Sequence, residues 1–143
     1  MSSEKNRALA RRFIDECWNQ GKVDVIDDLL APDHVHHFPD GDIEGADNIK
    51  EFILKMRIAF PDIAITIDDE IVSQDKVVFR WTARCTHLGD FFGMSPTGNS
   101  IEYTGIDIIR SSNGRIVELW SQTDAVGFDR QLKKKRRKEK SHR

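Results

Sequence analysis

The sequence predicts a single α+β domain, because helical patterns come first along the chain and strand patterns follow. Up to Phe60 the apolar residues recur every three or four positions, and beyond it they alternate with polar ones. A length of 143 residues suits one domain, and 38% apolar with 32% charged residues is ordinary for a globular protein. Helices followed by long antiparallel strands favour a curved sheet and helices that enclose a pocket for a small, largely apolar ligand.

Three helices are predicted, over residues 4–20, 23–30 and 46–60. In the first helix Leu9, Phe13 and Cys17 fall on one stripe, as expected for an amphipathic helix. The third helix carries a longer stripe, made of Ile49, Phe52, Ile53, Met56 and Phe60. Each helix is followed by Gly or Pro, which favour helix ends.

Strands are predicted from the alternation of apolar and polar side chains. A short strand over 34–38 precedes a turn, and longer strands begin at Ile63 and cover 77–86, 101–109 and 115–123. The Asn-Gly pair at 113–114 indicates a tight hairpin between the last two. One face of the second long strand is apolar and comprises Val77, Phe79, Trp81, Ala83 and Cys85.

Several classes of protein are excluded by what the sequence lacks. It has no phosphate-binding glycine loop, nucleophile elbow or zinc-protease motif, and no apolar run long enough to cross a membrane. No secretory signal is visible, so we expect a cytoplasmic protein whose Cys17 and Cys85 are buried thiols. Residues 133–143 carry eight Lys/Arg and one Glu, a charge of +7, so the net charge of −2 leaves −9 for residues 1–132. We expect 1–132 to form the domain and 133–143 to be a disordered basic tail.

Polar residues within apolar strands are the candidates for chemistry. Asp107 shares a face with Gly105 and Ile109, and a carboxylate there either reaches solvent or lines a cavity. His34 and His36 share one face of their strand and His37 the other; a pocket acid or base is favoured over a metal site, since no second ligand cluster is visible. Trp120 lies on the face opposite Leu119, where an exposed tryptophan would indicate a dimer interface.

Five segments together resemble the SnoaL-like polyketide cyclase or ester cyclase family. They are TARCTH at 82–87, FGMSPTG at 92–98, TGIDIIR at 104–110, NGRIVELW at 113–120 and GFDRQL at 127–132. The resemblance covers about residues 6–132 and implies the nuclear-transport-factor-2-like fold, a cone-shaped α+β barrel around an apolar pocket that often forms homodimers. The best-understood members close the last ring of aromatic polyketides by an intramolecular aldol reaction, with no metal or organic cofactor.

The resemblance also implies roles for individual residues. Ser121 stands where those cyclases have their catalytic aspartate, and Asp107 where they commonly have histidine. His36 replaces a common asparagine, and Trp18 matches an aromatic residue at the end of the first helix. We therefore expect Asp107 and His36 to be catalytic. The expected substrate-binding residues are Trp18, Trp81, Tyr103, Ser121, Phe91, Phe92 and Met94.

Two functions stay open from the sequence. In the first, Asp107 is a base that takes a proton next to a carbonyl, and His36 or Ser121 donates a hydrogen bond to the developing oxyanion. In the second, the fold is a non-catalytic module for ligand binding or dimerisation. The expected ligand is small, apolar or aromatic, and carries a carbonyl. We expect no contact with membranes, and none with nucleic acid except weakly through the tail.

Overall fold

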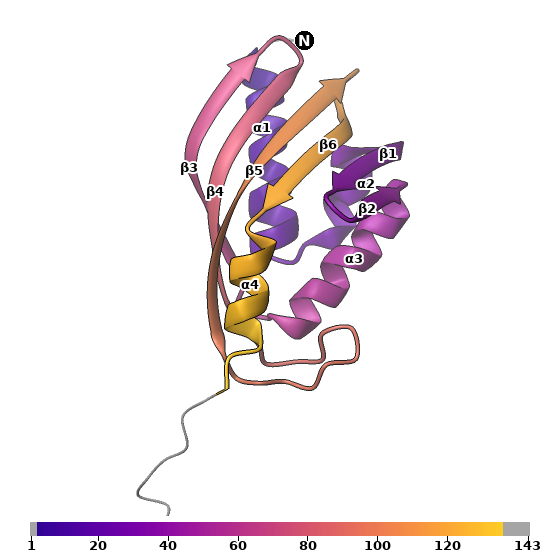
Figure 1. Cartoon of the computed structure of the whole chain (residues 1–143). Coiled ribbons are helices and arrows are strands. Elements are labelled where there is room, and N and C mark those ends of the chain that lie inside the picture. Colours follow the sequence, from indigo (N-terminus) through magenta and orange to yellow (C-terminus); the bar gives the residue numbers. More distant parts are fainter. Residues whose placement is uncertain (1–2, 136–143) are drawn as a thin grey trace, which may run out of the picture.

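The computed structural model describes residues 3–135, which form a curved six-stranded sheet with helices packed against it (Figure 1). The strand order is β2-β1-β6-β5-β4-β3. The strands are β1 (Leu30–Phe38), β2 (Gly41–Glu44), β3 (Ala64–Ser73), β4 (Lys76–Thr86), β5 (Ser100–Ser112) and β6 (Arg115–Thr123). The helices are α1 (Ser3–Arg12), a π-helix (Phe13–Asn19), a 3₁₀ turn (Val23–Val25), α2 (Ile26–Leu29), α3 (Ala46–Ala59) and α4 (Ala125–Leu132). No helix within the described residues is both long and apolar enough to span a membrane.

The predicted α+β class is confirmed, but the sheet is mixed and open. Strands β3 to β6 pair antiparallel as expected, whereas β1 lies parallel to β6. The alternation over residues 34–38 predicts a strand without giving its direction, which is why the sequence missed the parallel pair. The strand order leaves β2 and β3 as edges, so the expected barrel is an incompletely closed one.

The helices lie near the predicted ranges, and the structure differs from the prediction in three respects. The predicted helix over 4–20 is α1 continued by the π-helix. The predicted helix over 23–30 is a 3₁₀ turn followed by the short α2, and it ends at Leu29 because β1 begins at Leu30, earlier than the predicted strand over 34–38. Two short elements, β2 and α4, were not predicted. Asp124 caps the N-terminus of helix α4, since its Oδ1 accepts a hydrogen bond from the backbone N–H of Gly127 at 2.9 Å. In Figure 1, α1 lies behind β4 and β5, and α3 lies beside β1 and β2.

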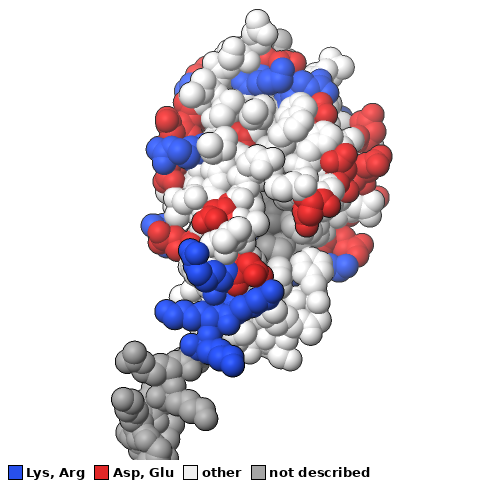
Figure 2. Space-filling view, in the orientation of Figure 1, with Lys and Arg blue, Asp and Glu red and all other residues white. Residues whose placement is uncertain are grey.

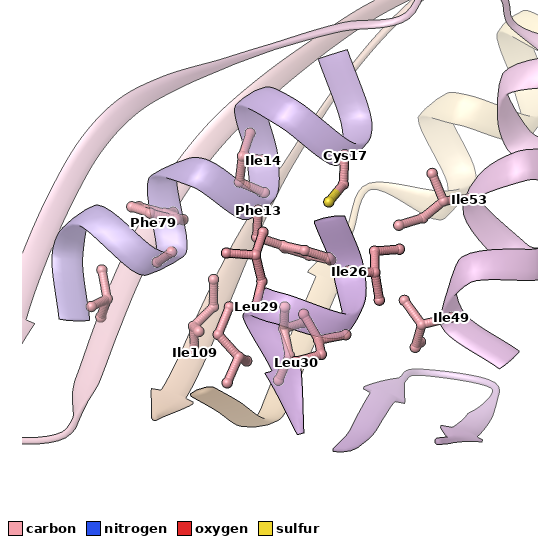
Figure 3. Close-up of a cluster of buried hydrophobic side chains, with 14 of the residues drawn as sticks. Phe13, Ile14, Cys17, Ile26, Leu29, Leu30, Ile49, Ile53, Phe79 and Ile109 are labelled. Carbon is pink, nitrogen blue, oxygen red and sulfur yellow. The ribbon is translucent and has the colours of Figure 1, made fainter. Parts of the chain in front are cut away.

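Two clusters of buried apolar side chains form the core. The larger joins the first helical segment to the sheet, and Figure 3 shows Phe13, Ile14 and Cys17 gathered with side chains that include Leu29 and Phe79. The smaller surrounds Phe60. Both cysteines are free and buried, which confirms that prediction, and burial raises the pKa of each thiol to about 12. The clusters meet at residues that touch both: Trp18, Ile65 and Tyr103.

The basic C-terminal segment lies mostly outside the described residues, since only 133–135 of 133–143 are described. Figure 2 shows lysine and arginine side chains gathered at the lower end of the molecule, beside the point where the described chain ends. The predicted disorder and function of the tail stay predictions.

Candidate active site

An aromatic cavity of about 760 Å³ opens where the two core clusters meet. Figure 2 shows a hollow near the middle of the face, with carboxylate groups around it. The lining comprises Ile14, Trp18, His36, Phe38, Pro39, Asp40, Gly41, Asp42, Ile43, Phe52, Met56, Ile65, Trp81, Phe91, Phe92, Tyr103, Asp107, Ser121, Thr123, Ala125 and Phe128. A volume of this size suits a small organic ligand, and the aromatic rings supply a large apolar contact area.

Asp107 lies in this cavity and is only 7% exposed. Its Oδ1 accepts two hydrogen bonds, from Ser121 Oγ at 2.7 Å and from Trp81 Nε1 at 3.1 Å. Ser121 is the direct partner of Asp107 across the β5–β6 pair, so the sheet register itself brings these side chains together. No group within residues 3–135 donates a hydrogen bond to Oδ2, and Oδ2 is not completely buried, so it remains accessible from the cavity. The carboxylate is therefore fixed through one oxygen and open through the other.

Gly105 makes room for the tryptophan that holds Asp107. Trp81 is the register partner of Gly105, and a Cβ at position 105 would overlap the Trp81 indole and lie 2.8 Å from the carbonyl oxygen of Gln122. Because position 105 has no side chain, the indole can lie over β5 and direct its N–H to Asp107, two residues further on. A glycine inside a predicted strand is a signal of such close packing.

The electrostatic state of Asp107 follows from its surroundings. Burial raises its pKa to about 6, and the hydrogen bonds from Ser121 and Trp81 oppose that rise. A carboxylate with this pKa is a stronger base than an exposed aspartate and is still mostly ionised near neutral pH. Buried groups with raised pKa values cluster at functional sites, which favours a catalytic role here.

His36 is buried beside the same cavity and forms a pair with His34. His36 Nδ1 lies 3.1 Å from His34 Nε2, and His34 Nδ1 lies 3.2 Å from the carbonyl oxygen of Ile116. The His36 ring stacks on Phe38 with centroids 4.8 Å apart. Burial lowers the pKa of His34 to about 4 and that of His36 well below its usual value, so both rings are neutral at neutral pH.

Tyr103 brings a hydroxyl group into the cavity. Its ring packs edge-on against Trp81, with centroids 5.6 Å apart, and against Phe128 at 4.8 Å. Its Oη has no hydrogen-bond partner among the described residues, and it is not completely buried, so it is accessible from the cavity. Burial raises the pKa of the Tyr103 phenol, which keeps it protonated and able to donate a hydrogen bond.

The sequence-derived site residues mostly come together. Of the nine, His36, Asp107, Trp18, Trp81, Tyr103, Ser121, Phe91 and Phe92 line the cavity. Met94 is not in the lining; it packs on the smaller core cluster and pairs with Phe91 through backbone hydrogen bonds of 2.9 Å. Sequence reasoning missed the aromatic residues Phe38, Phe52 and Phe128, whose only signal was their place on predicted elements or in the GFDRQL segment.

The three histidines of β1 do not assemble a metal centre. Among residues 3–135 no group of three or more His, Cys, Asp or Glu side chains is arranged to hold a metal ion. His34 and His36 point inward and bond to each other, whereas His37 points outward between Asp42 and Glu118, at 2.9 and 2.7 Å. The expected alternation of the three residues is confirmed.

Fold and cavity define a small α+β pocket protein with a buried acid. The sequence matches the SnoaL-like polyketide cyclase family over residues 8–132, and the chain belongs to that family. A search of curated proteins found no match.

Solved structures agree with this assignment. A proposed SnoaL-like polyketide cyclase from Jannaschia sp. CCS1 is 21% identical, with a TM-score of 0.84 over 90% of this chain and 92% of that one. IdmH, a proposed polyketide cyclase from Streptomyces antibioticus, is 30% identical, with a TM-score of 0.75 over 92% and 99%. AclR, a proposed hydroxylase from Streptomyces galilaeus, is 26% identical, with a TM-score of 0.81 over 99% and 88%. Since a proposed hydroxylase shares the fold, the reaction must be argued from the site.

Proposed function

We propose that the protein is a cofactor-independent cyclase or isomerase in which Asp107 removes a proton next to a carbonyl of an aromatic ligand. The observation that carries this proposal is the carboxyl group itself: it is buried in an aromatic cavity, fixed through Oδ1 and open through Oδ2. Donors that stay fixed during the reaction stabilise the correct geometry without reorganising.

The proposed reaction begins at Asp107 Oδ2, the carboxylate oxygen that has no hydrogen-bond partner among the described residues. Asp107 Oδ2 takes the proton from the carbon next to the carbonyl, and the electron pair of that C–H bond passes to the carbonyl oxygen as an enolate. In a cyclase the enolate carbon then attacks a second carbonyl of the same molecule, so one C–C bond forms. The alkoxide produced recovers the proton from Asp107, which is thereby regenerated as a carboxylate.

We assign the enolate oxygen to Tyr103 rather than to His36 or Ser121. The Ser121 hydroxyl proton is used by Asp107, and the Nδ1 proton of His36 is used by His34. The Tyr103 hydroxyl has no hydrogen-bond partner within the described residues and shares one face of β5 with Asp107, so it is a donor available to a ligand that lies against Asp107. A phenol whose pKa is raised by burial stays protonated while it donates.

Deuterium exchange next to a carbonyl tests the first step without knowledge of the natural substrate. Aromatic ketones such as 1-tetralone are incubated with the protein in D₂O, and NMR follows the loss of the α-proton signal. The wild-type protein should accelerate exchange, and Asp107→Asn should lose about 10²–10⁴-fold of that acceleration, as is typical of removing a general base.

Glu118→Gln is the matched control, because it also removes one carboxylate but on the outer face, where Glu118 bonds His37 and Arg110. It should exchange like the wild type. Equal exchange by wild type and Asp107→Asn would refute the proposal. Ketones that bind without any exchange would instead favour the non-catalytic binding module.

We also propose a homodimer through the outer face of the sheet. In register, Ile71, Val78, Ile108 and Trp120 form an apolar row across β3 to β6, and Ile71 is 60% exposed. Val78, Ile108 and Trp120 are half-buried, and Trp120 stacks on His37. A continuous apolar row on an outer face favours an interface. Sedimentation should find a dimer that Ile108→Glu converts to a folded monomer; a monomeric wild type would contradict this.

A further inference from the structure

The hydrogen bonds of His34 fix where the protons of both buried histidines lie. A carbonyl oxygen only accepts, so the contact with Ile116 places a proton on His34 Nδ1. His34 is neutral, because burial lowers its pKa to about 4, and its Nε2 therefore carries a lone pair. That lone pair accepts the proton on His36 Nδ1.

The same reasoning leaves His36 Nε2 without a proton. A neutral imidazole has one N–H, and in His36 it is directed to His34. Nε2 has no hydrogen-bond partner within residues 3–135, and it is not completely buried. It is therefore open toward the cavity that His36 lines. A ligand therefore meets a nitrogen acceptor at this position.

The charged side chains of the cavity also favour an uncharged ligand. They are the carboxylates of Asp40, Asp42 and Asp107, and no lysine or arginine lies among the lining residues of the described chain. An anionic ligand would lie close to these carboxylates, and the repulsion between like charges disfavours its binding. A hydroxyl or N–H group satisfies the acceptor and leaves no buried polar atom unpaired.

We propose that His36 Nε2 is a fixed acceptor that recognises a hydroxyl group of an uncharged aromatic ligand, and that His34 is the positioning residue that keeps this nitrogen unprotonated. The proposal rests on the proposed function in that it names the substrate class of the same cavity. In the sheet, β6 separates β1 from β5, so the backbones carrying His36 and Asp107 are about 10 Å apart. A fused-ring ligand can place its hydroxyl group at His36 and its reacting carbon at Asp107.

Nitrogen-15 NMR of the histidine-labelled protein near neutral pH tests the proton arrangement directly. Both His34 and His36 should be neutral with the proton on Nδ1, and Nε2 should show the shift of an unprotonated nitrogen. A proton on His36 Nε2 would overturn the proposal. This measurement uses the wild-type chain and so does not depend on whether a variant folds.

Binding of two probes tests the consequence for recognition. By tryptophan fluorescence, 2-naphthol should bind about fivefold more tightly than 2-methoxynaphthalene, which has the same rings but no donor, since one hydrogen bond contributes about 1 kcal/mol. In His34→Leu the His36 proton is free to move to Nε2, and the preference should fall to about onefold. Equal binding of the probes to the wild type, or an unchanged preference in His34→Leu, would overturn the proposal.

Asp107→Asn separates this proposal from the proposed function. The variant should keep the preference for 2-naphthol, because the acceptor argued for is His36, while it loses α-proton exchange. If the preference disappears in Asp107→Asn, Asp107 is the acceptor and the proposal about His36 fails. If the preference persists in a wild type that exchanges no ketone, recognition by His36 stands and the catalytic function fails.

Discussion

The two faces of the sheet hold the same residue types in opposite states, and His36 and His37 show it within one strand. His36 faces the cavity, where burial lowers its pKa well below the usual value. His37 faces outward between Glu118 and Asp42, and its hydrogen bonds to them raise its pKa. A shift of one position along a strand therefore changes a histidine whose pKa is lowered by burial into one whose pKa is raised by carboxylates.

The carboxylates divide in the same way. Asp107, on the inner face, has its pKa raised to about 6 by burial, whereas the pKa of Glu118 is lowered, chiefly by its hydrogen bond to His37. Inside, both residue types are shifted toward their neutral forms, and outside both are shifted toward their charged forms. The outer groups therefore form an ion-pair network, whereas the inner groups are shifted toward their neutral forms, as is typical of functional sites.

Among the substitutions on the inner face, Asp107→Asn should change the free energy of unfolding most strongly. Because the folded pKa of about 6 lies above the usual 3.8, the folded protein binds the proton more tightly, and stability falls as the pH rises through this window. Asparagine avoids that loss and keeps an oxygen for Ser121 and Trp81. At about pH 8 the variant should be more stable than the wild type by about 3 kcal/mol.

Urea unfolding at about pH 8 and pH 4 measures this difference. The advantage of Asp107→Asn should be much smaller at the lower pH, because the folded wild-type carboxyl is then protonated while the unfolded one, with its usual pKa of 3.8, is only partly ionised. A variant that is less stable than the wild type at the higher pH would contradict the account.

Gly105→Ala should disturb the inner face through packing. The added methyl group would overlap the Trp81 indole, which must move away from Asp107. We expect a loss of about 2 kcal/mol of unfolding free energy, typical of overpacking, and a further rise in the pKa of Asp107. Thr104→Ala, on the adjacent outward-facing position of β5, is the control and should cost less. Wild-type stability in Gly105→Ala would show that the close approach is not needed.

Glu118→Gln should have the smallest effect, because its partners are half-buried at the surface. The loss of unfolding free energy should be below about 1 kcal/mol. The raised pKa of His37 makes its contribution complete below pH 6.5 and lost as the pH rises, while the lowered pKa of Glu118 makes its own complete above 4.5. The loss should thus be largest between those two pH values, and a loss that grows toward about pH 9 would contradict the pairing.

The sequence predicted the parts of this molecule that depend on periodicity. Alternation placed Asp107 on the face of Gly105 and separated His36 from His37, and both placements agree with the structure. It left open whether Asp107 meets solvent or a cavity, because that depends on which helices cover the face. The parallel β1–β6 pair and the position of Phe128 depend on contacts between distant segments, which a local pattern does not carry.

The decisive measurement for the role of Asp107 as a base is the titration of its carboxyl group. Carbon-13 NMR of the labelled carboxyl group follows its protonation in the wild-type protein without any substrate. We expect a midpoint at about pH 6, because burial outweighs the hydrogen bonds from Ser121 and Trp81. In Ser121→Ala the midpoint should be higher, since one hydrogen bond to the charged form is lost. A wild-type midpoint at or below the usual 3.8 would show that Asp107 is an ordinary carboxylate and would contradict its proposed role as a base.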